Sequence, residues 1–362
     1  MALSRISLSD FRNHRQTGFD DTQQFNLLVG ENGAGKTNVL EALSLFAPGR
    51  GLRRAGLAEM AGAAGRGGFA VAASLVPTDG GDAVRLATLV DPRRPGRRAV
   101  RINSGDASAN SLGEWLALAW LTPAMDGLFM DSAGARRRYL DRLAVALDPA
   151  HARHVARYEA ALRERNRLLT GERMPDPSWM DGLEKQLAAH GAALGGGRAA
   201  LIAALRDELA QLPPEPFARP ILSYVPGGPA EAEPLQIALR EGRARERAAG
   251  RTLTGPHRDE LDVVMSGKLA PAANCSTGEQ KAMLIAITLA HAALAARGRP
   301  LVLLLDEVAA HLDPLRRAAL FERLVHSGAQ AWLTGTELPP FEPIRDRAAI
   351  WRVARGEAAR ID

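Results

Sequence analysis

The spacing of apolar residues predicts an α/β arrangement near the start of the chain. Residues 2–8 alternate weakly, as in a strand, and the apolar run at 24–30 ends in glycine, as a buried strand would. Residues 36–46 carry apolar side chains at helical spacing. Gly, Pro and Asp turns then separate three strand-like stretches, at 67–76, 83–90 and 98–103. Their short links predict an antiparallel meander.

The pattern becomes helical in the middle of the chain. Residues 135–169 and 178–212 have helical periodicity and are separated by a Pro-containing break at 171–177. We expect an antiparallel helical hairpin or small helical arm, and favour an ordinary helical subdomain over a long coiled coil. Loops at 213–216 and 226–234 flank a strand predicted at 221–225.

The last hundred residues return to an α/β pattern. The helix predicted at 278–298 precedes a continuous apolar run, "PLVLLLDE", of the type found in buried parallel strands. A strand and turn at 261–267, an amphipathic helix at 313–328 and strands at 330–336 and 349–358 complete the pattern. There is no internal repeat.

Composition narrows the class of protein only modestly. The 362 residues suffice for two domains, or for one large domain with an insertion. The net charge of +5 and pI of about 9.8 favour a polyanionic partner without establishing one. A single cysteine, Cys275, excludes an internal disulfide and a Cys-based metal cage. Since we find neither a signal peptide nor a membrane span, we expect a soluble, cytoplasmic protein without a membrane partner.

The strongest motif is a phosphate-binding loop between a predicted strand and a predicted helix. It matches G-x-x-x-x-G-K-[ST] in full and consists of Gly30, Glu31, Asn32, Gly33, Ala34, Gly35, Lys36 and Thr37. Its glycines let backbone N–H groups surround phosphates, and the helix N-terminus adds partial positive charge. We expect ATP here, with Lys36 on the β- and γ-phosphates and Thr37 on Mg²⁺.

An acidic pair follows the buried strand "LVLLL". Asp306 would hold Mg²⁺ indirectly, through water, and Glu307 would polarise the attacking water as the general base. An acidic pair at a strand end is weak alone, but with the phosphate loop upstream it indicates a Walker B motif.

Two further motifs occur in the order found in ABC-type ATPases. "STGEQK" begins at Ser276, includes Gly278 and resembles the ABC signature, although a Ser at a helix start is also an ordinary N-cap. His311, Leu312 and Asp313 resemble the D-loop. Because the chain has one phosphate loop, we expect its signature to contact the nucleotide of a second copy.

This ordered set resembles the ATPase heads of the SMC and RecF group. Four stretches resemble the RecF family more specifically: "FRN" at the start, the phosphate loop, "RRRYLDRL" at 136–143 and "TGPHRDEL" at 254–261. The resemblance implies an ABC-type ATPase head with mixed and antiparallel sheets and an inserted helical arm. It also implies ATP-dependent dimerisation, slow hydrolysis, binding to duplex DNA near single-strand gaps, and RecA loading with RecR and RecO.

The resemblance adds Arg12, Asn13 and Asn38 to the expected nucleotide contacts. It suggests two ATPase lobes, at 1–122 and 251–362, around a helical arm at 123–250. Two departures stand out. Pro123-Ala124-Met125-Asp126 replaces the usual "PED", and Thr334-Gly335-Thr336 stands where transporter ATPases place a histidine.

Other functions remain open. Ser276 lies 239 positions after Thr37, a longer spacing than a transporter subunit would have, and the helical runs are too short for SMC arms. Another DNA-repair or chromosome ATPase, or a DNA clamp that uses ATP without hydrolysis, would also fit.

With 5% aromatic residues and no aromatic-basic stripe, we expect contact with duplex backbone and no base-stacking platform. A solvated helix face is the favoured interpretation of each candidate contact; the candidates are Arg53, Arg54, Arg136, Arg137, Arg138, Arg243, Arg245 and Arg247.

Overall fold

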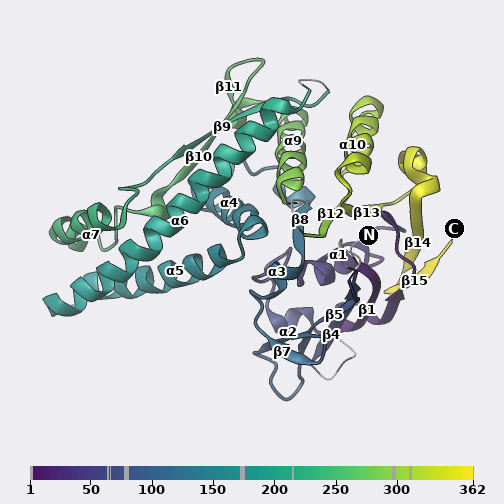
Figure 1. Ribbon diagram of the computed structural model, residues 1–362, viewed down its shortest axis with the longest axis horizontal. Coiled ribbons are helices and arrows are strands. Elements are labelled where there is room, and N and C mark those ends of the chain that lie inside the picture. Colours follow the sequence, from purple (N-terminus) through teal and green to yellow (C-terminus); the bar gives the residue numbers. More distant parts are fainter. Residues whose placement is uncertain are drawn as a thin grey trace. The chain divides into compact units, whose positions relative to one another are not determined.

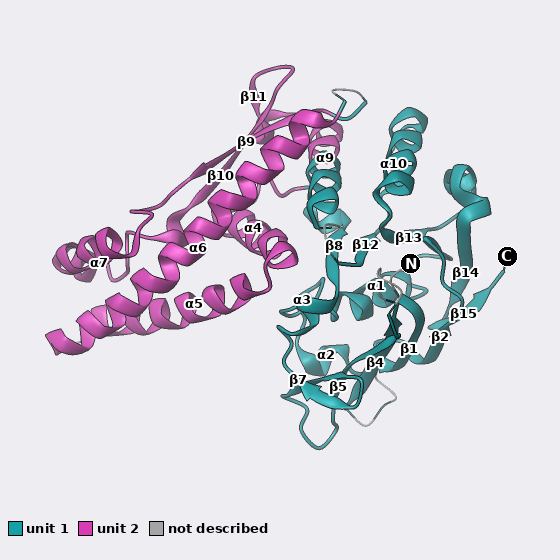
Figure 2. Ribbon diagram, in the orientation of Figure 1, with its two compact units in different colours: residues 1–126, 213–217, 284–362 teal, residues 127–212, 218–283 magenta. Residues whose placement is uncertain are grey.

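The computed structural model forms two compact units (Figures 1 and 2). It describes residues 3–62, 65, 67–76, 81–171, 176–213, 216–295, 299–309 and 312–361. Unit 1 comprises residues 1–126, 213–217 and 284–362, and unit 2 comprises 127–212 and 218–283. The boundary near residue 284 falls within one helix, α9 (Thr277–Ala295).

A six-stranded mixed sheet in unit 1 carries the phosphate loop. Its order is β15-β14-β3-β13-β12-β8, with only β15 antiparallel to its neighbour. The strands are β3 (Phe25–Val29), β8 (Ala117–Leu121), β12 (Leu301–Leu305), β13 (Gln330–Gly335), β14 (Ala348–Ala354) and β15 (Glu357–Arg360). Every residue of β3, β8, β12 and β13 is buried, as in parallel strands covered on both faces. The sequence patterns predicted β3 and β12 but missed β8.

A second sheet in unit 1 is antiparallel throughout, in the order β2-β1-β4-β5-β6-β7. Strands β4, β5 and β6 form the predicted meander, and the first predicted strand extends to Phe11 before turning into β2. The strands are β1 (Leu3–Phe11), β2 (His14–Phe19), β4 (Phe69–Leu75), β5 (Val84–Val90), β6 (Arg98–Ile102) and β7 (Gly105–Ala107). Buried residues alternate with partly exposed ones along β4 and β5, so one face packs into the core.

Short helices complete unit 1, and the first of them, α1 (Lys36–Ser44), begins at the phosphate loop. Between them, α1 and the two sheets supply most of one large apolar core. Among the described residues, the other helices that lie wholly within unit 1 are α2 (Leu57–Met60), α3 (Leu112–Trp115), α10 (Pro314–Ser327) and the 3-10 helices Pro123–Met125 and Pro339–Arg347.

Three helices dominate unit 2: α4 (Ala133–Leu147), α5 (Ala150–Leu169) and α6 (Pro177–Gln211). The run predicted at 135–169 is two helices, because Pro149 disfavours helical backbone at Asp148, whose ψ is 102°. Tyr158 and Ala161 of α5 share an apolar cluster with Leu187 of α6. This packing of α5 and α6 is the predicted helical hairpin.

A three-stranded antiparallel sheet, β11-β10-β9, also belongs to unit 2. The predicted strands at 221–225 and 261–267 are β9 (Pro220–Val225) and β10 (Glu260–Met265), and β11 (Ala270–Pro271) is short. Helices α7 (Ala232–Glu241) and α8 (Arg243–Ala248) follow β9, so the loop predicted at 226–234 ends three residues early. Within the described helices of both units, no segment is long and apolar enough to cross a bilayer.

A buried arginine joins three helices of unit 2. Arg165 of α5 is fully buried and donates to Glu184 of α6 at 3.0 and 3.1 Å. It also donates to Glu246 of α8 at 2.5 Å and to the Thr252 hydroxyl at 2.8 Å. Arg243 supplies a second cation to Glu184, which balances the two buried carboxylates. Each buried charge therefore has the partners that its removal from water requires.

We expect Arg165→Met to destabilise the protein by about 3–5 kcal/mol, because it leaves Glu184 and Glu246 buried with one cation fewer. Urea unfolding followed by circular dichroism measures the loss. Arg163→Met is the control, since the exposed Arg163–Glu159 pair should contribute about 0–1 kcal/mol. Equal stability of the two variants would show that the buried cluster contributes no more than a surface pair.

Candidate nucleotide site

The phosphate loop is held in shape by close backbone packing. A Cβ atom on Gly30 would lie 2.1 Å from the Val353 carbonyl oxygen, so no other residue fits there. Gly35 has φ of 115°, in the region that favours glycine, and a Cβ there would meet Asn13 and His14 at 2.8 Å. In the part of the chain that the structure describes, the N–H groups of Gly33, Gly35, Lys36 and Thr37 have no acceptor. Four backbone donors are thus available to an anion at the start of α1.

Lys36 is folded back onto the loop. Its ammonium group donates to the carbonyl oxygens of Gly30 at 2.6 Å and Glu31 at 2.8 Å, and only 4% of the residue is exposed. Burial lowers the pKa of Lys36, while the nearby Glu307 and Asp306 carboxylates oppose that shift. The ammonium N–H groups that bind these carbonyl oxygens could donate to phosphate oxygens instead. The side chain therefore suits an anionic ligand.

Asp306 connects the loop to two strands. It follows β12 and is buried, and its carboxylate accepts from the Thr37 hydroxyl, with oxygen distances of 2.9 and 3.1 Å. The Thr334 hydroxyl of β13 also lies 2.8 Å from Asp306 Oδ1, and the Asp306 N–H donates to the Leu121 carbonyl of β8. Thr37 and Asp306 together offer the hard oxygen ligands that Mg²⁺ prefers.

Glu307 has a strained backbone. Its φ is 52°, in the left-handed region that residues other than glycine rarely occupy. The Glu307 N–H lies 2.8 Å from Thr334 Oγ1, which fixes this turn. Such strain is typical of functional sites and holds a side chain at a defined position.

The β1–β2 turn lies against the phosphate loop. The Asn13 amide donates to the Ala34 carbonyl and accepts from Asn38 of α1. Arg12 makes a bidentate pair with Glu41 at 2.7 and 2.8 Å, which holds the pKa of Arg12 above its usual value. His14 is fully buried with Nε2 3.0 Å from the Gly35 carbonyl, and burial lowers the pKa of its ring.

The signature segment in unit 2 forms a capping box. The Ser276 hydroxyl accepts from the Glu279 N–H at 3.4 Å, and Glu279 accepts from the Ser276 N–H at 3.0 Å. Lys268 pairs with Glu279 at 2.5 Å and lowers the pKa of that carboxyl to about 2. Ser276, Thr277 and Gly278 are exposed at the start of α9.

The D-loop candidate contains the N-cap of α10. Asp313 accepts from the Arg316 N–H at 2.9 Å, and Leu312 is buried. His311 lies outside the described residues.

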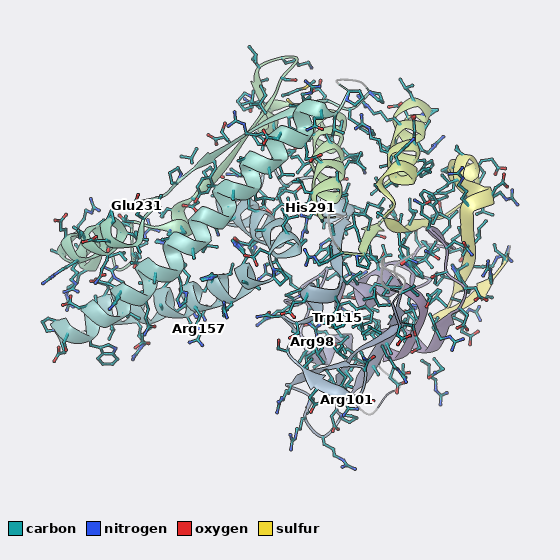
Figure 3. The ribbon with its side chains drawn as sticks, in the orientation of Figure 1. Arg98, Arg101, Trp115, Arg157, Glu231 and His291 are labelled. Carbon is teal, nitrogen blue, oxygen red and sulfur yellow. The ribbon has the colours of Figure 1, made fainter. Side chains whose placement is uncertain are left out.

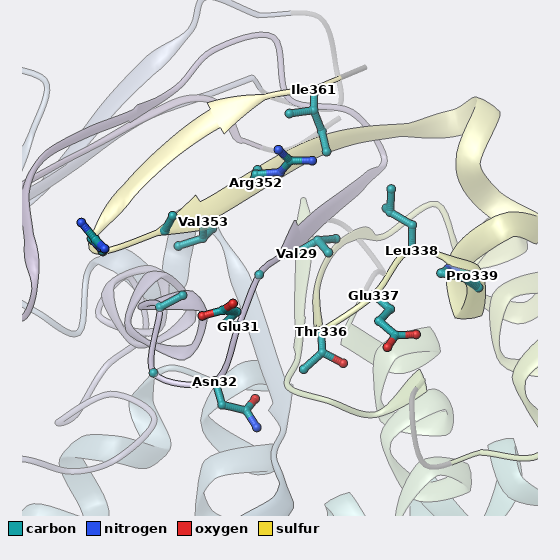
Figure 4. A pocket seen from close by; sticks show the side chains of 15 residues that line it. Val29, Glu31, Asn32, Thr336, Glu337, Leu338, Pro339, Arg352, Val353 and Ile361 are labelled. Carbon is teal, nitrogen blue, oxygen red and sulfur yellow. The ribbon is translucent and has the colours of Figure 1, made fainter.

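A cavity of about 870 Å³ lies beside the phosphate loop (Figure 4). Glu31 and Asn32 line it, together with residues 336–339 and 352–355. The cavity borders the phosphate loop, and its lining includes Glu31 but none of Lys36, Thr37, Asp306 and Glu307.

The chain is similar to known proteins over nearly its full length. Residues 2–337 match the family model described as the RecF/RecN/SMC N terminal domain. A curated protein of Mesorhizobium japonicum, "DNA replication and repair protein RecF", is 46% identical over 98% of this chain and 96% of its own length. The protein of the same name from Rhizobium rhizogenes is 44% identical, over 98% of this chain and 97% of its own. The chain belongs to the RecF family.

Solved structures show the same fold. A RecF structure described as the recombination mediator protein RecF-ATP has a TM-score of 0.86 at 21% identity, covering 100% of this chain and 98% of its own. An SMC head domain from Pyrococcus furiosus has a TM-score of 0.54 at 16% identity, with coverage of 99% and 96%. The expected ABC-type ATPase head with mixed and antiparallel sheets and a helical arm is therefore confirmed.

Several predicted site residues of this RecF family member lie together in unit 1. Residues 30–37, Asn38 and Asn13 form one hydrogen-bonded region, which Thr37 joins to Asp306. Arg12 is beside it but is bound by Glu41, while Asp313 caps α10 and has no bond to this region in the described part of unit 1. Ser276 and Gly278 belong to unit 2.

The sequence analysis missed three contributors, His14, Glu41 and the bridging role of Thr334. His14 directly follows the quoted "FRN", and Thr334 begins the segment 334–336, which the sequence analysis compares only with a histidine position of transporter ATPases. Glu41 stands among apolar residues of α1. A carboxylate in that position could have indicated a buried ion pair.

We expect Thr334→Val to slow ATP turnover much more than it weakens ATP binding. The near-isosteric change removes the hydroxyl that Asp306 and the Glu307 N–H contact, and should cost about 1–3 kcal/mol of stability. Steady-state hydrolysis and calorimetric ATP binding measure the two effects.

Thr288→Val is the matched control. Thr288 is equally buried, but its hydroxyl donates within its own helix, to the Leu284 carbonyl. Equal loss of turnover in both variants would mean that Thr334 acts only through general stability.

Proposed function

We propose that this chain is an ATP-dependent DNA-binding protein of recombinational repair. The main support for this proposal is the hydrogen bond between Thr37 of the phosphate loop and the buried Asp306. It brings a phosphate-binding loop and a carboxylate suited to Mg²⁺ to one place. Its RecF relatives are described as DNA replication and repair proteins, and a solved RecF is described with ATP. We infer the same ligand here, with the phosphates at residues 30–37.

Each residue of the proposed site has a role that follows from its chemistry. The free N–H groups of the loop and Lys36 would bind and orient the β- and γ-phosphates. Thr37 and, through water, Asp306 would hold Mg²⁺, which when bound neutralises developing charge on the phosphates. Glu307 would accept a proton from the attacking water. We propose that hydrolysis is slow and limits how long the protein stays on DNA. It would not drive movement along the DNA.

We propose that the active form is a homodimer in which each chain lends its signature to the other. A single phosphate loop and a single exposed signature in one chain support this arrangement, because a two-fold axis then makes two equal composite sites. Asn13 and Arg12 would flank the nucleotide of their own chain, and Ser276, Gly278 and Asp313 would act at the partner's nucleotide or the dimer interface.

The proposed partners are duplex DNA near single-strand junctions and RecR, in assisting RecA loading with RecO. A solved relative is placed by its description in the RecFOR pathway, which supports this. We propose a cytoplasmic location, and lobes at 1–122 and 251–362 separated by an arm at 123–250.

Duplex DNA binding with and without ATP tests the proposed function. We expect Glu307→Gln to bind ATP, to stop turnover and to stay on DNA at least about tenfold longer than the wild type, because it removes the proposed base and keeps Asp306. Lys36→Ala should bind ATP and DNA poorly, whereas Lys185→Ala, at an exposed position on α6, should behave as wild type. Equal wild-type affinity for DNA in both nucleotide states would contradict the switch.

We expect Ser276→Arg to bind ATP as a monomer but to fail to dimerise. The larger side chain would occupy the place proposed for the partner's γ-phosphate, while loss of the N-cap should cost only about 0.5–2 kcal/mol and leave α9 folded. Sedimentation with and without ATP measures the oligomeric state. Ser276→Asp is the second variant, since it keeps the cap and repels a phosphate. ATP-induced dimers of both variants, formed as readily as by the wild type, would rule out the trans arrangement.

A further inference from the structure

Most arginines that the sequence suggested as DNA contacts are already engaged inside the protein. Arg136 pairs with Glu260, Arg137 donates to the Asp259 carbonyl, and Arg243 pairs with Glu184 and Asp181. Arg247 donates to Gly171, and Arg53 of unit 1 to Glu41 and Asn38. A guanidinium bound to a carboxylate gains little by moving to a phosphate, because its first partner is then left unpaired. Only Arg54, Arg138 and Arg245 of that set remain exposed without a described partner.

Two segments of unit 1 have the opposite character. Residues 45–58 and 92–105 together contain eight arginines and no acidic residue. Five of these arginines are exposed and make no side-chain hydrogen bond or ion pair with the described residues: Arg50, Arg54, Arg93, Arg94 and Arg97. We call these five the arginine cluster.

Arg98 brings the two segments together. It lies at the start of β6, and its guanidinium donates to the Gly49 carbonyl at 2.7 Å, to the Leu45 carbonyl and to Thr88. Burial lowers the pKa of Arg98 to about 10, so it stays charged at neutral pH. Gly49 and Arg98 directly adjoin Arg50 and Arg97, so this contact fixes the bases of both exposed groups. Arg98 and Arg101, which contacts Asp106, are labelled in Figure 3.

The β5–β6 turn is also stiff. Asp91 accepts from the Arg93 N–H at 2.9 Å, and further turn bonds link Arg94 to Asp91 and Arg97 to Arg94. Pro92 and Pro95 fix two more backbone angles. Ordering such a loop on a ligand costs little entropy. Asp91, the one carboxylate of this turn, already accepts from the backbone N–H of Arg93.

From this arrangement we propose that the arginine cluster of unit 1 is the principal phosphate-contacting surface for duplex DNA. The inference rests on the proposed function and locates its DNA contact. The two segments carry charge without an apolar anchor, since their one aromatic residue, Phe46, is fully buried. A protein partner would favour an apolar centre, and single-stranded DNA would favour exposed aromatic rings. A rigid set of unpaired guanidinium groups suits the phosphates of a duplex.

The cluster is also attached to the nucleotide site. Arg53 lies between Arg50 and Arg54 and donates to Asn38 at 2.7 Å and to Glu41 at 2.8 Å, both on the helix that begins at Lys36. Asn38 in turn contacts Asn13, which donates to the phosphate loop at Ala34. A DNA contact here would therefore be held by the same hydrogen bonds that support the loop.

A matched pair of triple variants tests the proposal. Arg93→Gln, Arg94→Gln and Arg97→Gln remove three charges from the cluster. Arg153→Gln, Arg157→Gln and Arg245→Gln remove three charges from exposed arginines of unit 2 that have no described partner, and Figure 3 labels Arg157 among them. Fluorescence anisotropy of a random-sequence duplex is measured with ATP over a series of salt concentrations. Sedimentation with ATP and the hydrolysis rate report the fold and the dimer.

We expect the cluster variant to lose about tenfold or more in affinity, and its plot of log affinity against log salt to become shallower by about 2 to 3. It should still dimerise and hydrolyse ATP. The unit 2 variant should keep both the affinity and the slope. Wild-type affinity and slope in the cluster variant, or an equal loss in both variants, would overturn the proposed surface while leaving the proposed function intact. Failure of the wild type to bind duplex DNA with ATP would instead refute the proposed function.

Discussion

The burial of one carboxylate, Asp306, determines how the site of unit 1 is assembled. A charge removed from water must find hydrogen bonds, and Asp306 finds them on the loop after β3 and on β13, while its own N–H bonds to β8. The parallel strands end at the same edge of the sheet, so the groups that follow them lie close together there. The same Thr334 hydroxyl contacts the Glu307 N–H, so the strained turn that displays Glu307 also depends on Asp306.

Local patterns in the sequence were sufficient to predict most elements of the candidate site. The phosphate loop, β12 and the meander have strong signals, since each combines an apolar run with Gly, Pro or Asp at its ends. The strand β8 was missed because five apolar residues fit either a strand or a helix. The order of the strands in the sheet is set by pairing between residues that lie up to hundreds of positions apart in the sequence. No local signal could reveal that Leu121 ends a strand that pairs with β12.

The arginines show a different limit of sequence reading. Arg136 and Arg243 look like solvent-facing cations in a helical pattern, but carboxylates distant in sequence bind them. The segments around Arg50 and Arg93 lack acidic residues, but the sequence does not reveal that they lie together, because their proximity depends on Arg98. Counting basic residues therefore measures the net attraction to a polyanion, whereas the pairing of each guanidinium decides where that attraction can act.

Ser276 reconciles two roles that its sequence left as alternatives. A hydroxyl has acceptor lone pairs and one O–H donor, and the cap uses acceptance from the Glu279 N–H. The O–H also bonds to the Glu279 carboxylate, and rotating it onto a phosphate oxygen would leave the cap in place, because the lone pair keeps its bond to the N–H. The carboxylate of Glu279 would repel that phosphate, but Lys268 holds it in an ion pair and compensates its charge. The capping box thus orients the Ser276 hydroxyl at the start of a helix, where the backbone N–H groups already favour an anion.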